Sequence, residues 1–105
     1  MRRVDYRRVF RGGEVYRVEG IKVVCLKGVE KRLFGLSISG HIKSAVVRNR
    51  LRRRLKEIYR RHRQSIKRDV QMVVIVRPEM ARARFAELEE GVLRGFRKAQ
   101  VFVAQ

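Results

Sequence analysis

The sequence predicts an α+β domain with a four-stranded mixed sheet and three helices, in the order αβββαβα. Two segments, near 44–65 and 81–100, carry apolar residues at helical spacing. Four shorter segments are apolar or alternate apolar with polar residues, as strands do. A chain of 105 residues with 45% hydrophobic residues can bury one core. Residues 1–105 are therefore expected to form a single domain.

The first part of the chain predicts a short helix followed by three strands. The helix is expected over residues 3–11, with Gly12-Gly13 ending it. The strands are expected at 14–19, 21–27 and 33–39. Between them, Gly20 is read as a bulge or bend, and Gly28-Val29-Glu30-Lys31 as a hairpin-like turn.

The second part predicts a long helix, a central strand and a last helix. Ser44 is a suitable N-cap for a helix over about 44–65. The β-branched run Met72–Val76 reads as a central strand that Pro78 ends. A crossover through the long helix would be right-handed by default if the strands it joins are parallel. The last helix, about 81–100, has an apolar stripe and acids expected to point away from it: Phe85, Leu88, Val92 and Phe96 against Glu87, Glu89 and Glu90.

The long helix has one apolar side and one densely cationic side. From Arg48 to Arg63, nine of sixteen residues are Arg or Lys, and Glu57 is the only acid. Because like charges at i,i+4 repel, folding alone does not favour this pattern, and an ordinary solvated face would carry mixed signs. A polyanion would offset the repulsion. The apolar arc is Val47, Leu51, Leu55 and Ile58, and the opposite face is Arg48, Asn49, Arg52, Arg53, Lys56 and Arg60.

Composition favours a nucleic-acid partner over a membrane. The net charge is +18, and 21 of the 28 basic residues are Arg, whose planar fork pairs with phosphate. There is no apolar run of about 20 residues and no visible signal peptide. Cys25, alone in an apolar run, is expected in the core. The chain is therefore predicted to be a basic cytoplasmic nucleic-acid-binding domain.

The residues do not form a recognisable catalytic or metal-binding pattern. His41 and His62 lie 21 positions apart, and both are read as surface histidines. Glu87, Glu89 and Glu90 on the last helix are better explained as a solvated face than as a cation site. No catalytic residue and no metal ligand is predicted in this chain.

The first helix combines aromatic rings with cations. Tyr6 and Phe10 are four residues apart, with Arg7 and Arg11 beside them. Aromatic rings that stack on bases and cations that neutralise phosphates are what single-stranded RNA requires. The alternative for both rings is that they only fill the core. For Asn49, the alternative to contact with RNA or with RNA-bound metal hydration is an ordinary polar surface residue.

Several runs together resemble the protein subunit of bacterial ribonuclease P, over almost the whole chain from Asp5 to about Phe102. The most specific is the Arg-Asn-Arg block with its basic continuation, Ala45-Val46-Val47-Arg48-Asn49-Arg50-Leu51-Arg52-Arg53-Arg54-Leu55-Lys56-Glu57. The others are Asp5-Tyr6-Arg7-Arg8-Val9-Phe10, Gly35-Leu36-Ser37-Ile38-Ser39 and Val73-Val74-Ile75-Val76-Arg77-Pro78.

The resemblance implies a fold like the second domain of ribosomal protein S5, with an unusual left-handed crossover. It implies a protein cofactor whose RNA partner is the catalyst, using bound Mg²⁺ to remove the 5′ leader of precursor tRNA. No protein partner is implied. The implied contacts to the catalytic RNA are Arg48, Asn49, Arg50, Arg52, Arg53 and Lys56, and the implied residues of a leader cleft are Tyr6 and Phe10. The residue pattern itself adds Arg60, on the same cationic face, to the first site and Arg7 and Arg11, beside the two rings, to the second.

The chain departs from the family pattern at a few positions. Gly40-His41-Ile42-Lys43 replaces a loop that usually carries two lysines and a glycine, and Lys43 only partly replaces them. Val24 and Gln71 stand where an aromatic residue and an Asp are common, and Tyr6 replaces Phe. Two other functions stay open: a ribosomal or other structural RNA-binding protein without leader recognition, and a protein-only nuclease, against which the missing carboxylate or His cluster speaks.

Overall fold

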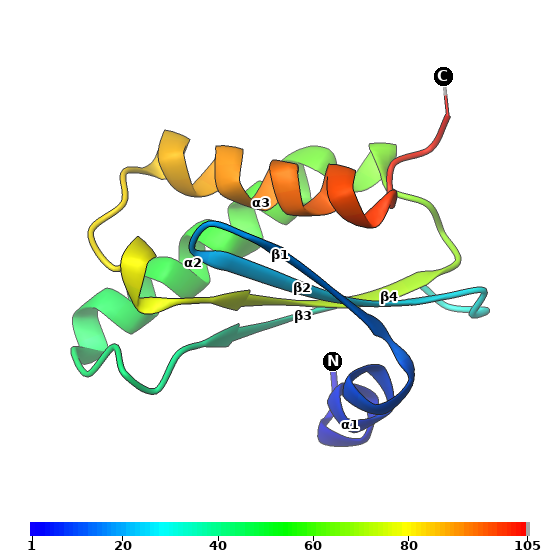
Figure 1. The fold of residues 1–105 in the computed structure, drawn as a ribbon, viewed down its shortest axis with the longest axis horizontal. Coiled ribbons are helices and arrows are strands. Elements are labelled where there is room, and N and C mark those ends of the chain that lie inside the picture. Colours follow the sequence, from blue (N-terminus) through cyan, green and yellow to red (C-terminus); the bar gives the residue numbers. More distant parts are fainter. Residues whose placement is uncertain (105) are drawn as a thin grey trace.

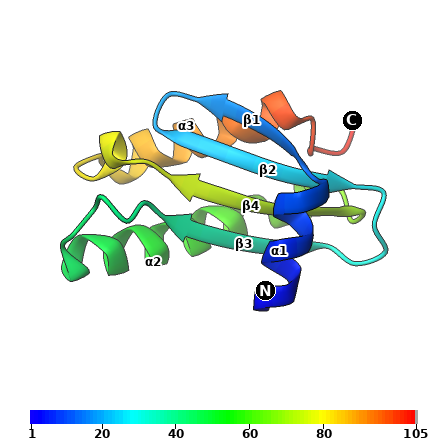
Figure 2. The ribbon, with the colours of Figure 1, turned by 60° about the horizontal axis from the view of Figure 1, so that its bottom comes forward.

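One mixed sheet of four strands separates helix α1 from helices α2 and α3 (Figures 1 and 2). The structure is a computed structural model and describes residues 1–104. The predicted order αβββαβα is confirmed. The elements are α1 (Arg3–Gly12), β1 (Glu14–Val18), β2 (Ile21–Lys27), β3 (Leu33–Ile38), α2 (Ala45–His62), β4 (Val70–Val76) and α3 (Phe85–Ala99), with short 3-10 turns η1 (Arg63–Ser65) and η2 (Pro78–Met80).

The last strand in sequence lies inside the sheet, whose order is β1-β2-β4-β3. Strand β4 pairs antiparallel with β2 and parallel with β3. The predicted hairpin-like turn at 28–31 is therefore wrong, because β4 lies between the two strands that this segment connects. The tight turn is instead at Gly20, whose φ of 76° lets β1 and β2 pair directly.

The connection from β3 through α2 to β4 is left-handed. In Figure 2, β3 and β4 both run to the left, β4 lies above β3, and α2 passes behind the sheet. Viewed from the α2 side, with both strands running upward, β4 thus lies to the left of β3. The default right-handed expectation was wrong, and the handedness implied by the family resemblance is the one present.

The main core lies between the sheet and helices α2 and α3. The predicted arc of α2 is confirmed, with Leu51, Leu55 and Ile58 fully buried and Val47 partly buried. Full burial of such side chains contributes about 1.5–3 kcal/mol each. Cys25 is also buried here, as predicted. From α3, the predicted stripe supplies the buried Leu88, Val92 and Phe96, with Phe85 packed at its margin.

Element ends differ from prediction by a few residues. Ser44 caps α2 as expected, since its Oγ accepts a hydrogen bond from Val47 N at 3.3 Å. Helix α2 ends at His62, and residues 63–65 tighten into η1. Helix α3 begins at Phe85 rather than near 81, because the preceding residues form η2 and a turn after Pro78.

A second, smaller core lies under α1 on the opposite face of the sheet. Val9 packs there against Val24 and Val73, and all three are buried. The helix comes close to the sheet beside β3, where Tyr6 lies over Gly35. A Cβ on Gly35 would approach Tyr6 Cε1 to 2.8 Å. Glycine is therefore required here by the close approach of an aromatic ring.

Candidate nucleic-acid interface

The polar face of α2 carries a row of exposed side chains with no partner in the protein. Asn49, Arg52, Arg53 and Lys56 are exposed and make no hydrogen bond or ion pair within residues 1–104. The opposite side of the same helix is fixed in the core by Leu51, Leu55 and Ile58. The cations are therefore displayed on a rigid helix and remain available to an anionic ligand. We call these four residues the α2 polar row.

Two arginines of the Arg-Asn-Arg block are used by the protein itself. Arg48 is half-buried, and its Nη1 donates hydrogen bonds to the carbonyl oxygens of Ser39 at 2.7 Å and Ile42 at 3.2 Å. Arg50 is also half-buried, and its Nη2 donates to Ala81 O at 3.3 Å. The prediction that Arg48 lies free on the polar face was wrong. RNA contact by either residue stays a prediction.

Arg54, one turn after Arg50, repeats the same arrangement. Its Nη1 donates to Ala83 O at 3.1 Å, so two arginines of α2 hold the segment that leads from η2 into α3.

Arg60, predicted to contact RNA, is exposed but forms a salt bridge with Glu57 at 2.6 Å. An exposed pair of this kind is weak, so an anion could replace Glu57 as the partner of Arg60.

A row of sheet residues beside α1 is left without a helix above it. Arg17, Lys22, Ile75 and Ser37 are register partners across the four strands. Side chains alternate along each strand, so these four share the face of Val24 and Val73, which α1 covers. None of the four is fully buried. Figure 2 shows α1 crossing one end of the sheet and leaving the other end open.

Aromatic rings from α1 border this open row. Tyr6 is held in place because its hydroxyl donates to Leu36 O and accepts from Leu36 N, each at 3.2 Å. Phe10 is 47% exposed, and its ring centroid lies 6.3 Å from that of Tyr6. Core filling therefore does not account for Phe10. We call Tyr6, Phe10 and the four row residues the α1-side surface.

The other two predicted leader residues do not lie between α1 and the sheet. Arg7 and Arg11 are exposed and border a shallow surface hollow with Val4, Arg8 and Gly12. At about 100° per residue, both lie on the side of α1 opposite the buried Val9. They can attract a nearby strand of RNA through charge, and direct contact with a leader stays a prediction.

Sequence reasoning missed the sheet part of this surface. Lys22 and Arg17 looked like ordinary strand positions because the pairing of β1, β2, β4 and β3 was unknown. One signal was available, because alternation along the predicted strand puts Arg17 on the face opposite Tyr16 and Val18.

Gln71, noted as a departure from the usual Asp, is buried, and its Oε1 accepts a hydrogen bond from Arg8 Nε at 3.2 Å. It thus helps hold α1 on the sheet.

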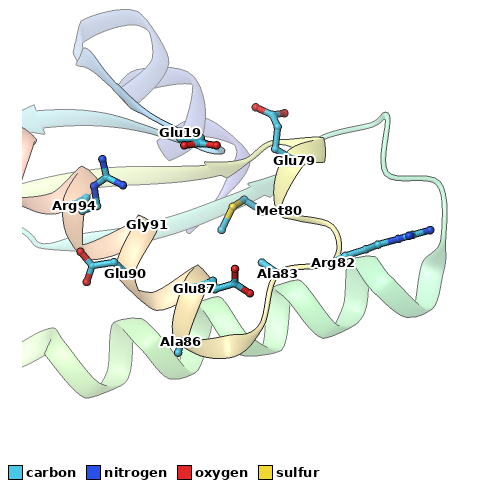
Figure 3. Close-up of a pocket in the computed structure, with 10 residues that line it drawn as sticks. All are labelled: Glu19, Glu79, Met80, Arg82, Ala83, Ala86, Glu87, Glu90, Gly91 and Arg94. Atoms are coloured by element: carbon cyan, nitrogen blue, oxygen red, sulfur yellow. The ribbon is translucent and has the colours of Figure 1, made fainter.

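An acidic groove occupies a different part of the surface (Figure 3). Four of the ten acids in the chain line this hollow of about 630 Å³, with Met80 pointing into it and Arg94 at its side. Its acids would repel phosphates. This part of the surface is therefore a poor match for RNA. The acids are Glu19, Glu79, Glu87 and Glu90.

Glu89 departs from the prediction that the acids of α3 point away from the apolar stripe into solvent. Its carboxylate bridges to α2, with Arg61 Nη1 and His62 Nε2 each at 3.1 Å from Oε2. Burial raises the pKa of Glu89, but the hydrogen bonds from His62 and Arg61 outweigh burial and hold the pKa below its usual value. His62 is therefore a half-buried interhelix contact rather than a free surface histidine.

No helix within residues 1–104 combines the length and apolar character needed to cross a membrane. In the same residues, no three His, Cys, Asp or Glu side chains are grouped so as to hold a metal ion. The fold and these surfaces define a small, strongly basic α+β domain, with a row of cations on helix α2 and an aromatic-bordered face on the other side of the sheet.

Comparison with known proteins assigns this domain to a family. The family model described as Ribonuclease P matches residues 1–100. The ribonuclease P protein component of Dictyoglomus turgidum is 36% identical over 100 residues, covering 92% of this chain and 84% of that protein. The chain belongs to the ribonuclease P protein family, whose members are components of an endoribonuclease of tRNA processing and therefore have RNA as a partner.

Solved structures agree with this fold. The ribonuclease P protein from Thermotoga maritima superposes with a TM-score of 0.79 at 28% identity, covering 90% of this chain and 91% of that one. The Staphylococcus aureus protein gives a TM-score of 0.87 at 20% identity, covering 98% and 95%. The α+β fold with its mixed sheet is thus that of ribonuclease P proteins.

Proposed function

We propose that this chain binds the catalytic RNA of ribonuclease P and the 5′ leader of precursor tRNA. It would assist magnesium-dependent removal of that leader in the cytoplasm. The observation that supports this most is the presence of two different RNA-suited surfaces. One is the α2 polar row, and the other is the α1-side surface. A protein that only neutralised RNA charge would need the first surface but not the second.

The α2 polar row suits a folded RNA. Its cations are carried by a helix whose apolar side is buried in the core, so the backbone needs no ordering on binding. Guanidinium groups of Arg52 and Arg53 can pair with phosphates bidentately, and Lys56 adds a point charge. Asn49, at the N-terminal end of the row, can donate to and accept from sugar or base groups. This surface would dock the catalytic RNA.

The α1-side surface suits a single strand. Phe10 offers an exposed ring for base stacking, while Lys22 and Arg17 lie where the phosphates of a strand crossing the sheet would pass. Ser37 adds a hydroxyl to the same row. Stacking and phosphate contacts together do not require a particular base sequence. The proposal therefore assigns leader binding to this surface without a fixed leader sequence.

Magnesium is not assigned to protein ligands. The residues described do not fit a metal site, because no suitable cluster of three His, Cys, Asp or Glu occurs among positions 1–104. In the proposal Mg²⁺ belongs to the RNA. The part played by this chain is to reduce repulsion between catalytic RNA and precursor, and to position the leader strand.

Comparing precursor and mature tRNA tests the proposal. The reconstituted particle should bind precursor tRNA more tightly than mature tRNA, because only the precursor has a leader for the α1-side surface. Phe10→Ala should remove much of this preference, since base stacking contributes about 1–3 kcal/mol per base. Val103→Ala is a matched control, because Val103 is similarly exposed, at 44%, and lies outside both surfaces.

A cleavage assay with each component omitted completes the test. Protein alone with Mg²⁺ should cleave nothing. If the protein strengthens binding of precursor and mature tRNA equally, a structural RNA-binding role without leader recognition is the better description. If rigorously RNA-free protein cleaves precursor tRNA, the cofactor role is wrong and a protein-only nuclease must be considered.

A further inference from the structure

A second concentration of unpaired cations lies at the far end of α2. A hollow of about 800 Å³ is bordered by the connection between β2 and β3 and by the segment that follows α2. Its lining residues are Glu30, Lys31, Arg32, Arg63, Gln64 and Arg68. We call this hollow the α2 C-terminal pocket. It holds four cations and one acid, and it is separate from both surfaces described above.

Arg32 holds the two sides of this pocket together. Its Nη1 donates hydrogen bonds to Arg63 O and Ile66 O, each at 3.0 Å. These carbonyls lie just past the last turn of α2, where the helix dipole is negative and would repel an anion. A guanidinium placed on them counteracts that negative end. The geometry therefore removes the usual obstacle to anion binding at a helix C-terminus.

The remaining cations of the pocket have no partner in the protein. Lys31, Arg63 and Arg68 are exposed, and their side chains make no hydrogen bond or ion pair within residues 1–104. Three unpaired cations around one hollow repel one another, so the fold gains nothing from gathering them. A phosphate group would relieve this repulsion. Glu30 is the only acid in the lining, so the net charge of the pocket is positive.

We propose that the α2 C-terminal pocket binds a backbone phosphate of ribonuclease P RNA, as a site distinct from the α2 polar row. Arg63 follows Lys56, the last residue of the α2 polar row, by seven positions and Asn49, the first, by fourteen, so the pocket lies about 10–21 Å along the helix from that row. At that separation, one RNA segment on the polar row and another in the pocket would fix the protein's orientation along α2. This inference rests on the proposed function, because it assumes the same RNA partner.

Salt dependence measures the contact. Each phosphate neutralised contributes about 0.7–0.9 to the log–log slope of affinity against salt. Arg63→Gln combined with Arg68→Gln should reduce that slope by about 0.7–0.9, the contribution of one phosphate, and weaken binding of the cognate RNA severalfold. Arg94→Gln, on the exposed α3 surface beside the acidic groove, is a control for the loss of a cation elsewhere and should leave the slope nearly unchanged.

Tethered cleavage locates the contact. An iron chelate attached at Gln64→Cys should cleave RNA nucleotides different from those cleaved by a chelate at Asn49→Cys. A chelate at Ala86→Cys, in the acidic groove, should cut only at background level. The natural thiol does not interfere, because Cys25 is buried and burial raises its pKa. Inorganic phosphate, titrated into RNA-free protein and followed by ³¹P NMR, should bind only weakly.

The outcomes separate this inference from the proposed function. Distinct Gln64-directed cleavage with a reduced slope supports the pocket as an RNA site. Cleavage from position 49 but none from position 64, or an unchanged slope, overturns it and leaves the proposed function intact. Tight phosphate binding that the double variant abolishes without affecting RNA affinity would reassign the pocket to a free anion. If no tethered chelate cleaves RNA and the reconstituted particle does not prefer precursor tRNA, both proposals are wrong.

Discussion

Arg48 and Arg53 lie on the same helix, yet their replacement by Ala should have different effects. Arg53→Ala should weaken binding to ribonuclease P RNA without changing stability, because the Arg53 side chain is exposed and makes no hydrogen bond or ion pair within residues 1–104. Arg48→Ala should affect both binding and stability. The Arg48 guanidinium joins α2 to the loop after β3 through Ser39 O at 2.7 Å and Ile42 O at 3.2 Å.

The magnitudes follow from these contacts. A hydrogen bond from a charged donor contributes about 1.5–3 kcal/mol when it is buried. Arg48 is only half-buried, and water can replace part of what it provides, so its loss should lower the free energy of unfolding by about 1–3 kcal/mol in total. Leu55→Ala calibrates the scale, since emptying a fully buried leucine site costs about 2–5 kcal/mol. Arg53→Ala should stay within about 0.5 kcal/mol of the parent.

Urea denaturation followed by circular dichroism measures stability, and equilibrium binding at fixed salt measures RNA affinity. The expected stability order is Arg53→Ala, then Arg48→Ala, then Leu55→Ala, from most to least stable. Arg53→Ala should nevertheless lose about 1.5–3 kcal/mol of binding free energy. If it unfolds as easily as Leu55→Ala, the orientation of α2 described above is wrong. If Arg48→Ala keeps full stability, its two carbonyl contacts contribute nothing.

Three further outcomes are expected. RNA affinity should fall steeply with chloride, with a log–log slope steeper than about −2, because several phosphates are neutralised; a shallower slope would contradict the electrostatic account. Gly35→Ala should cost about 1–3 kcal/mol in urea and reduce the preference for precursor tRNA, since its Cβ would displace the Tyr6 ring; unchanged preference would exclude Tyr6 from leader binding. The lowered pKa of Glu89 means that its ion pair with Arg61 and its hydrogen bond with His62 stabilise the fold above the unfolded pKa of about 4.3, and that this stability is lost as pH falls through the folded pKa. Glu89→Gln should therefore be less stable than the parent at pH 7 but similar to it near pH 3, and a difference independent of pH would contradict this.

The α2 helix was predictable because its two faces differ so strongly in composition. Apolar spacing alone identified Leu51, Leu55 and Ile58 as the buried side, and the charge pattern identified Arg53 as exposed. The positions of Arg48 and Arg50 were not predictable, since Arg48 reaches carbonyls of the loop that precedes the helix and Arg50 reaches Ala81 O, 31 residues away. A helical wheel contains no information about which loops pass beside the helix.

The sheet was predictable in content but not in order. Strand positions followed from β-branched runs and alternation, whereas β4 between β2 and β3 depends on long-range pairing that local sequence does not specify. The row of Arg17, Lys22, Ile75 and Ser37 exists only in that pairing. For the same reason, the four sheet residues of the α1-side surface could be recognised only in three dimensions.

The central place of β4 has a consequence for how the chain reaches its folded state. Strands β2 and β3 do not pair with each other, because β4 lies between them. Residues 1–69 can therefore form the β1–β2 hairpin and isolated helices, but not the sheet. Because such nonlocal pairing must overcome loop-closure entropy, it slows folding. During synthesis, the cationic helix would leave the ribosome before the strand that completes its supporting core. A nascent chain would thus expose a basic, unsupported helix to surrounding ribosomal RNA until Val76 has emerged.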